Sequence, residues 1–351
     1  MSAPRSLCLL RLSAIGDVSH VVPLVRTLQR HWPQCRLTWV VGRTEYGLVG
    51  GLEGVEFIVV DKGEGLIGAA RRLRRTLAGR RFEVLLHLQA SWRANLLASV
   101  ISAERRVGFD RARACNGQGW FIDTPLVGPS RVHVLDGFFQ FLEVLGLNAR
   151  ELRWQIPVPE AAKLRVEAQV AAAEPFLAIS PCSSIRARNF RNWSPQRYAA
   201  VADHAYRQRG LSLVLTGGPT EQERAYAQAI TAACRAAPVI DLIGQTTLPE
   251  LLAVLTRACA FVGPDSGPLH LANAVATPVV GLYATSNPQR TGPYCFLDSV
   301  ADRYPEAIYA AYGRPVSELR WGQRVRQADA MERITVHDVT ARLDALLSNS
   351  V

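Results

Sequence analysis

An acidic side chain stands in a turn near the start of the chain, within residues 12–20. Asp17 follows Gly16, which permits a tight turn between an apolar run and a helical pattern. An aspartate in this place has two interpretations: it caps the helix by accepting backbone hydrogen bonds, or it is a general base in a cleft. His20 lies three residues on and would share a helix face with Asp17.

A second acidic turn, at residues 262–270, also joins an apolar run to a helical pattern. Gly263 and Gly267 let the backbone approach a ligand closely, and the amides at a helix N-terminus favour a phosphate. Asp265 and Ser266 either cap this helix or contact a ribose or sugar hydroxyl. The pattern is therefore typical both of a well-capped turn and of a nucleotide site.

Two more turns carry polar side chains. Ser183 and Ser184 follow an apolar run, and Arg191 lies shortly downstream. Small hydroxyl groups with arginines suit a diphosphate, although an arginine cluster is also typical of a solvated surface. Glu221 follows a Gly-Gly-Pro turn, where it could accept hydrogen bonds from a ribose or favour the first turn of a helix.

An arginine-rich helical pattern spans residues 66–78, and Arg71, Arg74 and Arg75 share one of its faces. This pattern predicts either a phosphate-binding patch, for a lipid-linked or nucleic-acid partner, or a solvated face.

Residues 63–68 match G-x-G-x-x-G, which would indicate NAD binding. The match follows a later strand than the first, so NAD binding is a weak alternative.

Apolar runs alternate with helical patterns along the chain, which predicts an α/β fold with parallel sheets covered on both faces. We expect two doubly wound Rossmann-like domains facing a cleft, residues 1–165 and 166–351, with the last helix packing back on the first domain. In such sheets ligands bind beyond the carboxyl ends of the strands. The expected strands are 7–12, 37–41, 57–60, 84–88, 176–180, 211–216, 239–242, 260–263 and 279–283.

The composition argues against several classes of protein. The seven cysteines are scattered without a C-x-x-C, which favours reduced thiols in a cytosolic protein. We expect no signal peptide, no membrane span and no metal site, because no matching motif occurs. Of the net charge of +10, residues 1–170 hold most, with 23 basic and 15 acidic side chains. This excess favours an anionic partner for the first domain.

Four motifs occur in order along the chain: S-x-x-G-D-V-x-H at 13–20, R-N-W-S-P at 191–195, G-G-P-x-E at 217–221 and G-P-D-S-G-x-x-H-L-A at 263–272. Over residues 6–290 this set resembles the ADP-heptose:lipopolysaccharide heptosyltransferase family, glycosyltransferase family nine. The resemblance implies a metal-independent enzyme of the glycosyltransferase B type. It places the acceptor on the first domain and the nucleotide sugar on the second.

The resemblance also implies a role for each motif residue. Asp17 would be the base that deprotonates the acceptor hydroxyl for an inverting attack on the anomeric carbon. Ser183, Ser184 and Arg191 would face the diphosphate, Glu221 the ribose and the backbone near Thr246 the base. The implied donor-binding residues are Ser183, Ser184, Arg191, Glu221, Thr246, Asp265, Ser266, Gly267 and His270.

The implied substrates are ADP-heptose, with no other cofactor, and a phosphorylated, lipid-linked core oligosaccharide. Arg71, Arg74 and Arg75 are the candidate acceptor contacts, and the enzyme would be cytoplasmic, in peripheral contact with the anionic inner face of the inner membrane. Arg191 stands where the family often has lysine, which leaves the identity of the sugar open. The stretch 291–326 suggests no function.

Three alternatives remain from the sequence. One is a transferase of the same fold that uses another nucleotide sugar. Another is an NAD-dependent oxidoreductase built on residues 63–68. A basic nucleic-acid-binding protein without enzymatic activity is disfavoured, because no recognition motif accompanies the positive charge.

Overall fold

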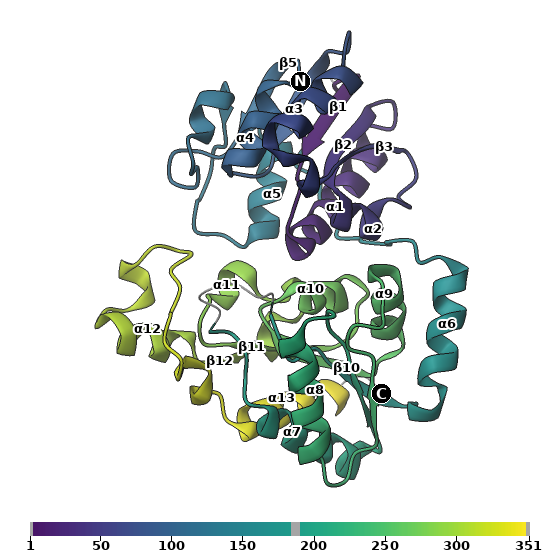
Figure 1. Cartoon of the computed structure of the whole chain (residues 1–351). Helices are drawn as coiled ribbons and strands as arrows, with labels where there is room; N and C mark the ends of the chain where they lie inside the picture. The colour runs from purple at the N-terminus through teal and green to yellow at the C-terminus, as the bar shows by residue number, and fades with distance from the viewer. Residues whose placement is uncertain (1–2, 184–189, 349–351) are drawn as a thin grey trace. The chain divides into compact units, whose positions relative to one another are not determined.

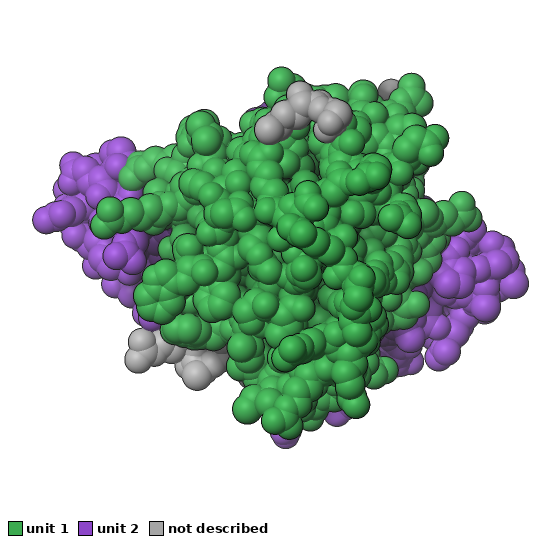
Figure 2. Space-filling view, turned by 90° about the horizontal axis from the view of Figure 1, so that it is seen from above, with its two compact units in different colours: residues 1–157 green, residues 158–351 purple. Residues whose placement is uncertain are grey.

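The computed structural model describes residues 3–183 and 190–348. The chain divides into two compact units, residues 1–157 and 158–351 (Figure 2). The domain boundary predicted from the sequence follows residue 165, which lies inside helix α6 (Glu160–Val170). This helix packs against α9 (Leu248–Arg257) of unit 2, so the units divide ahead of it.

Unit 1 is built on a six-stranded parallel sheet in the order β3-β2-β1-β4-β5-β6 (Figure 1). The order reverses between β1 and β4, which makes this the topological switch point where such sheets bind ligands. The strands are β1 (Ser6–Leu10), β2 (Arg36–Gly42), β3 (Val55–Val60), β4 (Phe82–His87), β5 (Ala103–Gly108) and β6 (Thr124–Pro125).

Helices cover both faces of this sheet. Cys8 and Leu10 pack in one core with residues of α3 and α4, while the alternate residues Leu7 and Leu9 are fully buried on the opposite face. On that face α1 contacts α2 and α5. The helices are α1 (Ile15–His31), α2 (Arg43–Val49), α3 (Gly65–Thr76), α4 (Trp92–Ser99) and α5 (Val134–Glu143), with short 3-10 helices η1 (Lys62–Glu64) and η2 (Gln118–Phe121).

Strand β5 was not among the expected strands, because Arg105 and Arg106 interrupt its apolar pattern. Both guanidinium groups cap main-chain oxygens instead of entering the core. Arg105 donates to the carbonyl of Val144 at 3.2 Å, and Arg106 donates to that of Ala98 at 2.8 Å. The arginine side chains thus tie the strand to helix ends, a role that apolar periodicity does not reveal.

Unit 2 repeats the topology. Its parallel sheet has the order β12-β11-β10-β7-β8-β9, which is the order of unit 1 when its strands are counted from β7. Its switch point therefore lies between β7 and β10. The strands are β7 (Phe176–Ile179), β8 (Ser212–Leu215), β9 (Val239–Asp241), β10 (Ala260–Pro264), β11 (Val279–Tyr283) and β12 (Ala301–Asp302). The predicted α/β fold with two Rossmann-like domains is confirmed.

The last helix of unit 2, α13 (Val336–Ser348), packs against α7 (Pro195–Arg209) of the same unit. Within the described ranges, no helix is long and apolar enough to cross a membrane. The remaining helices are α8 (Glu221–Ala233), α10 (Gly267–Ala274), α11 (Pro288–Thr291) and α12 (Tyr304–Tyr312), with 3-10 helices η3 (Ala171–Ala173), η4 (Tyr294–Ser299), η5 (Val316–Glu318) and η6 (Ala330–Arg333).

Candidate active site

Asp17 lies in the first turn of α1, just beyond the carboxyl end of β1. Gly16 was expected to form a tight turn, but the helix begins at Ile15, so Gly16 is helical and forms no such turn. The residue that precedes the helix is Ala14, which has no side-chain capping bond. Because Asp17 lies inside the helix and its carboxylate binds Arg11, the capping interpretation is wrong.

Arg11 fixes the orientation of the Asp17 carboxylate. Its side chain is only 11% exposed, whereas that of Asp17 is 34% exposed. Arg11 also donates to the carbonyl of Leu88 at 2.6 Å and lies over the ring of Phe138, 5.4 Å from its centroid. The guanidinium is thus held from three sides, and the carboxylate that it orients keeps an accessible surface.

Gln89 joins the two loops at the switch point of unit 1. It follows β4, and its Oε1 accepts hydrogen bonds from the backbone amides of Leu12 at 2.8 Å and Ser13 at 3.3 Å. These are the residues that lead into α1. His20, expected beside Asp17, is buried and packs edge-on against His133 with 5.5 Å between ring centroids. His20 is therefore part of the buried packing of unit 1.

In unit 2, Asp265 follows β10 and is surrounded by basic side chains. Its Oδ2 lies 3.2 Å from Nη1 of Arg324 and 3.7 Å from Nη1 of Arg191. Nε2 of His270 lies 3.8 Å from its Oδ1. The aspartate side chain is 8% exposed, so this cluster is a nearly buried carboxylate among arginine charges.

The ionisation of Asp265 is set by opposing effects. Burial raises the pKa of the carboxyl, but the interaction with His270 and the charges of Arg324 and Arg191 outweigh burial and hold the pKa well below its usual range. Asp265 is therefore a permanent anion at neutral pH. A carboxylate held so firmly in its ionised form cannot accept a proton as a general base.

Arg191 and Ser183 reach the same edge from the segment after β7. Arg191 donates to the carbonyl of Asp265 at 2.7 Å, and the backbone amide of Ser183 donates to Oδ1 of Asn192 at 3.0 Å. Ser183 is buried, and Ser184 lies outside the described residues. The structure thus brings Ser183 and Arg191 to the Asp265 turn across the switch point.

The N-terminus of the helix that follows Asp265 lies next to this cluster. Ser266 is the residue before α10, and Gly267 is the first residue of the helix. The hydroxyl of Ser266 is buried and makes no hydrogen bond within the described ranges. A helix N-terminus carries partial positive charge and unsatisfied amides, so the cluster and the helix together form a site for an anion.

Glu221 and Thr246 lie in neighbouring turns at the same edge of the sheet. The amide of Gly244, after β9, donates to the carbonyl of Gly217, after β8, at 3.0 Å. Glu221 begins α8 with an exposed side chain. Glu223, which the sequence analysis did not single out, accepts a hydrogen bond from the amide of Gly218 at 2.7 Å and so holds the glycine turn.

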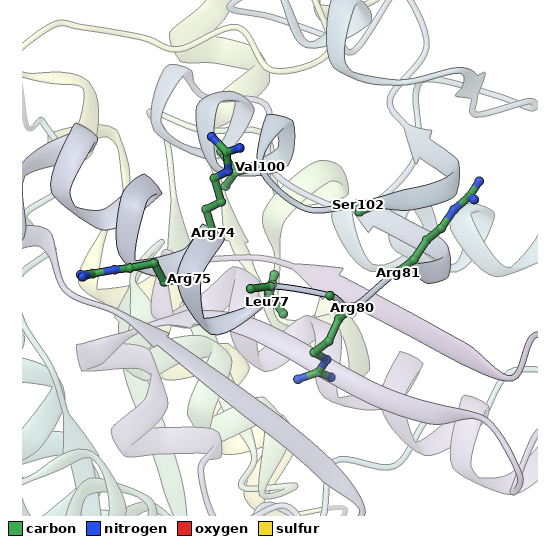
Figure 3. A pocket seen from close by; sticks show the side chains of 9 residues that line it. Arg74, Arg75, Leu77, Arg80, Arg81, Val100 and Ser102 are labelled. Carbon is green, nitrogen blue, oxygen red and sulfur yellow. The ribbon is translucent and has the colours of Figure 1, made fainter.

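The three candidate acceptor arginines lie elsewhere in unit 1. Arg71, Arg74 and Arg75 are exposed on α3, which ends at the amino edge of the sheet, opposite the edge that carries Asp17. Arg74 and Arg75 line a hollow of about 540 Å³, and Figure 3 shows their side chains extending in different directions. The structure does not bring them together with Asp17.

The functional candidates that the sequence analysis missed are Arg11, Gln89, Glu223 and Arg324. Each is recognisable only from its partner. Arg324 is 59 residues from Asp265 in the chain, within the stretch to which no function was given. No group of three or more His, Cys, Asp or Glu side chains that could hold a metal ion occurs in the part of the chain that the structure describes.

The chain is similar to proteins of known function. Residues 70–302 match the model of a family described as glycosyltransferase family 9 (heptosyltransferase). The chain is 36% identical to the lipopolysaccharide core heptosyltransferase OpsX of Haemophilus influenzae, over 98% of this chain and 97% of that protein.

Two solved structures share the fold over nearly the full length of both chains. A glycosyl transferase family 9 protein from Veillonella parvula superposes with a TM-score of 0.78 at 22% identity, covering 98% of this chain and 97% of that one. The ADP-heptose lps heptosyltransferase II of E. coli has a TM-score of 0.70 at 19% identity, covering 98% and 99%.

Proposed function

Because this chain belongs to glycosyltransferase family 9 (heptosyltransferase), we propose that it moves heptose from ADP-heptose to a lipopolysaccharide core acceptor with inversion at the anomeric carbon. The chain is a glycosyltransferase with two Rossmann-like units of the glycosyltransferase B type. The observation that carries the mechanism is Asp17, a partly exposed carboxylate oriented by the mostly buried side chain of Arg11 at the switch point of unit 1.

Asp17 acts as the general base. An acceptor hydroxyl that hydrogen-bonds to its carboxylate loses its proton to Asp17 as the oxygen attacks the anomeric carbon. The new bond joins the acceptor oxygen to that carbon, and the bond from the carbon to the ADP phosphate oxygen breaks. Arg11 holds the carboxylate in the orientation that receives the proton.

The diphosphate leaving group binds at the carboxyl edge of the unit 2 sheet. Arg191 and the N-terminus of α10 supply positive charge where the phosphate oxygen becomes negative. We assign this stabilisation to the protein's own groups, so that the transfer proceeds without a metal ion. Asp265 orients Arg191, and its neighbour His270 supports the turn.

The adenosine lies over the neighbouring turns of unit 2. Glu221, whose side chain is exposed at the start of α8, accepts the ribose hydroxyls, and the backbone near Thr246 borders the base. Ser183 faces the diphosphate from the segment after β7. These assignments extend the donor site from the switch point toward β9.

The acceptor is a phosphorylated, lipid-linked oligosaccharide. Arg71, Arg74 and Arg75 lie away from Asp17, so we assign them to anionic groups remote from the reacting hydroxyl, at the surface of an anionic membrane. Such contacts place the enzyme at the cytoplasmic face of the inner membrane.

The replacement Asp17→Asn tests the mechanism. With ADP-heptose and an acceptor core, we expect kcat to fall about 10²- to 10⁴-fold because the base is lost, while the affinity for ADP, measured by calorimetry, stays within twofold. The wild-type enzyme, tested with ADP-, UDP- and GDP-sugars, identifies the donor. Transfer at the wild-type rate by Asp17→Asn would exclude Asp17 as the base, and a β-configured product from a β-configured donor would exclude inversion.

A further inference from the structure

Residues 320–326 form a strap without helix or strand, which begins with a turn closed by the hydrogen bond from the amide of Gln323 to the carbonyl of Arg320 at 2.8 Å. Its backbone is anchored on both sides of Arg324. Tyr304 donates its hydroxyl to the carbonyl of Gln323 at 2.8 Å, and Tyr312 donates to the carbonyl of Arg324 at 2.7 Å. The amide of Val325 donates to the carbonyl of Thr285 at 3.1 Å.

These hydrogen bonds hold one side chain at the donor edge. The two tyrosines come from the two ends of α12, so that helix and the strap together place the guanidinium of Arg324 at 3.2 Å from Asp265. The side chain of Arg324 is 35% exposed, against 18% for Arg191. Arg324 is therefore the more accessible of the two arginines to a ligand.

The charges of the cluster do not balance. Arg191 and Arg324 each carry a full positive charge, while Asp265 supplies one negative charge. A second anion would neutralise the excess, and the N-terminus of α10 adds partial positive charge at the same edge. The electrostatics fit a group with more than one negative charge, such as a diphosphate.

Two buried hydroxyls at this edge lack partners within the described ranges. Ser266 precedes α10, and Ser286 follows β11; neither Oγ makes a hydrogen bond there, and the residues are 8% and 3% exposed. A buried hydroxyl without a partner loses the hydrogen bonds that it made to water. Such groups next to an excess of positive charge indicate the place of a bound anionic ligand.

We propose that Arg324, delivered by the strap, binds the diphosphate of the nucleotide-sugar donor directly. This rests on the proposed function, because it adds a residue to the same donor site. This gives α12 and the strap a function. Both belong to the C-terminal part of the chain, and together they add a residue to the donor site. In the transfer step Arg324 stabilises the negative charge that develops on the departing phosphate.

The replacement Arg324→Met tests the proposal in the full-length protein by titration calorimetry with ADP and, separately, with adenosine. We expect the affinity for ADP to fall about tenfold to a hundredfold, because a charge-assisted contact is lost. The affinity for adenosine should stay within twofold. Arg324→Lys should restore part of the loss, since it keeps the charge without the planar donors. Arg326→Met removes an exposed arginine of the same strap and serves as the matched control.

The outcomes separate the possible roles of Arg324. If Arg324→Met binds ADP as the wild type does, the proposal is wrong. Equal losses for ADP and adenosine would mean that Arg324 only supports the fold, which also overturns it. If Arg324→Met does not fold, Arg324→Lys provides the test. If Arg324 contacts the diphosphate, the Lys variant should bind ADP more weakly than the wild type and bind adenosine with the same affinity. A wild-type protein that binds UDP or GDP but not ADP would refute the proposed donor, and the same variants titrated with that nucleotide would still test the diphosphate contact.

Discussion

Two aspartates occupy corresponding edges of two sheets with the same topology, yet their surroundings differ in almost every respect. Asp17 follows the first strand of its sheet, has one arginine partner and is a third exposed. Asp265 follows the fourth strand of the other sheet, lies among two arginines and a histidine and is nearly buried. Asp17 lies in the first turn of helix α1 and Asp265 in the bend before α10. Both are next to a switch point, where doubly wound sheets bind ligands.

The difference separates two kinds of chemistry. A general base must be reached by its substrate and must be able to take up a proton, and only Asp17 is accessible. Asp265 is instead an internal counter-ion: it gathers Arg191 and Arg324 at the N-terminus of α10 and fixes their positions. We therefore propose a catalytic role for Asp17 and a positioning role for Asp265, although both are aspartates at equivalent edges of their sheets.

We expect the same substitution to have effects of different size at the two aspartates. The largest difference is in the free energy of unfolding. Asp265→Asn leaves two arginine charges facing each other with no carboxylate, so we expect the free energy of unfolding to fall by about 3 kcal/mol. Asp17→Asn should change it by less than about 1 kcal/mol, because the carboxylate is partly solvated. Urea unfolding of both variants at pH 7 measures the difference.

The ligand provides the control. Saturating ADP should restore part of the stability of Asp265→Asn, because the diphosphate supplies negative charge to the same arginines. Equal stability losses for the two variants would contradict the distinction between an open and a closed aspartate.

The features that depend on local sequence patterns could be predicted from the sequence. Continuous apolar strands alternating with helices predicted both Rossmann-like units, and the short motifs predicted Asp17 and Asp265. The start of α1 was misjudged, because Gly16 was interpreted as a turn although the helix begins at Ile15. The preference of glycine for turns is weak, and tertiary packing overrides it here.

The surroundings of each aspartate could not be predicted, because they come from distant parts of the chain. Arg324 is 59 residues from Asp265, and Gln89 is 77 residues from Leu12, whose amide it binds. Side-chain contacts of this kind leave no periodic pattern. The sequence shows 38 arginines, and only their three-dimensional partners distinguish the functional ones from the others.

Removal of Arg11, the cation that pairs with Asp17, should have a smaller effect, confined to the chemical step. Arg11→Met leaves the carboxylate without its orienting partner, so we expect kcat to fall about tenfold, equivalent to about 1.4 kcal/mol. The KM for ADP-heptose should remain unchanged, because the proposed donor site lies in unit 2. Arg150→Met is a matched control in unit 1, since Arg150 also pairs with carboxylates and lies 5.0 Å from the ring centroid of Phe139. A fall in kcat of the same size for Arg150→Met would show that Arg11 acts only through the fold.

The smallest expected effect is a change with pH in the difference between the unfolding free energies of the wild type and Asp265→Asn. The folded protein holds the pKa of Asp265 below its unfolded value of about 3.9, because the interaction with His270 and the charges of Arg324 and Arg191 outweigh burial. A depressed carboxyl pKa contributes stability that is complete above pH 4 and is lost as the pH falls, because the unfolded chain binds the proton first. We therefore expect the stability difference between the wild type and Asp265→Asn to be constant from pH 7 to pH 5 and to shrink by about 1 kcal/mol between pH 4 and pH 3. Urea unfolding of both proteins across this range measures the difference. A difference that does not change down to pH 3 would mean that Asp265 titrates alike in the folded and the unfolded chain, and the contrast with Asp17 would then be one of exposure alone.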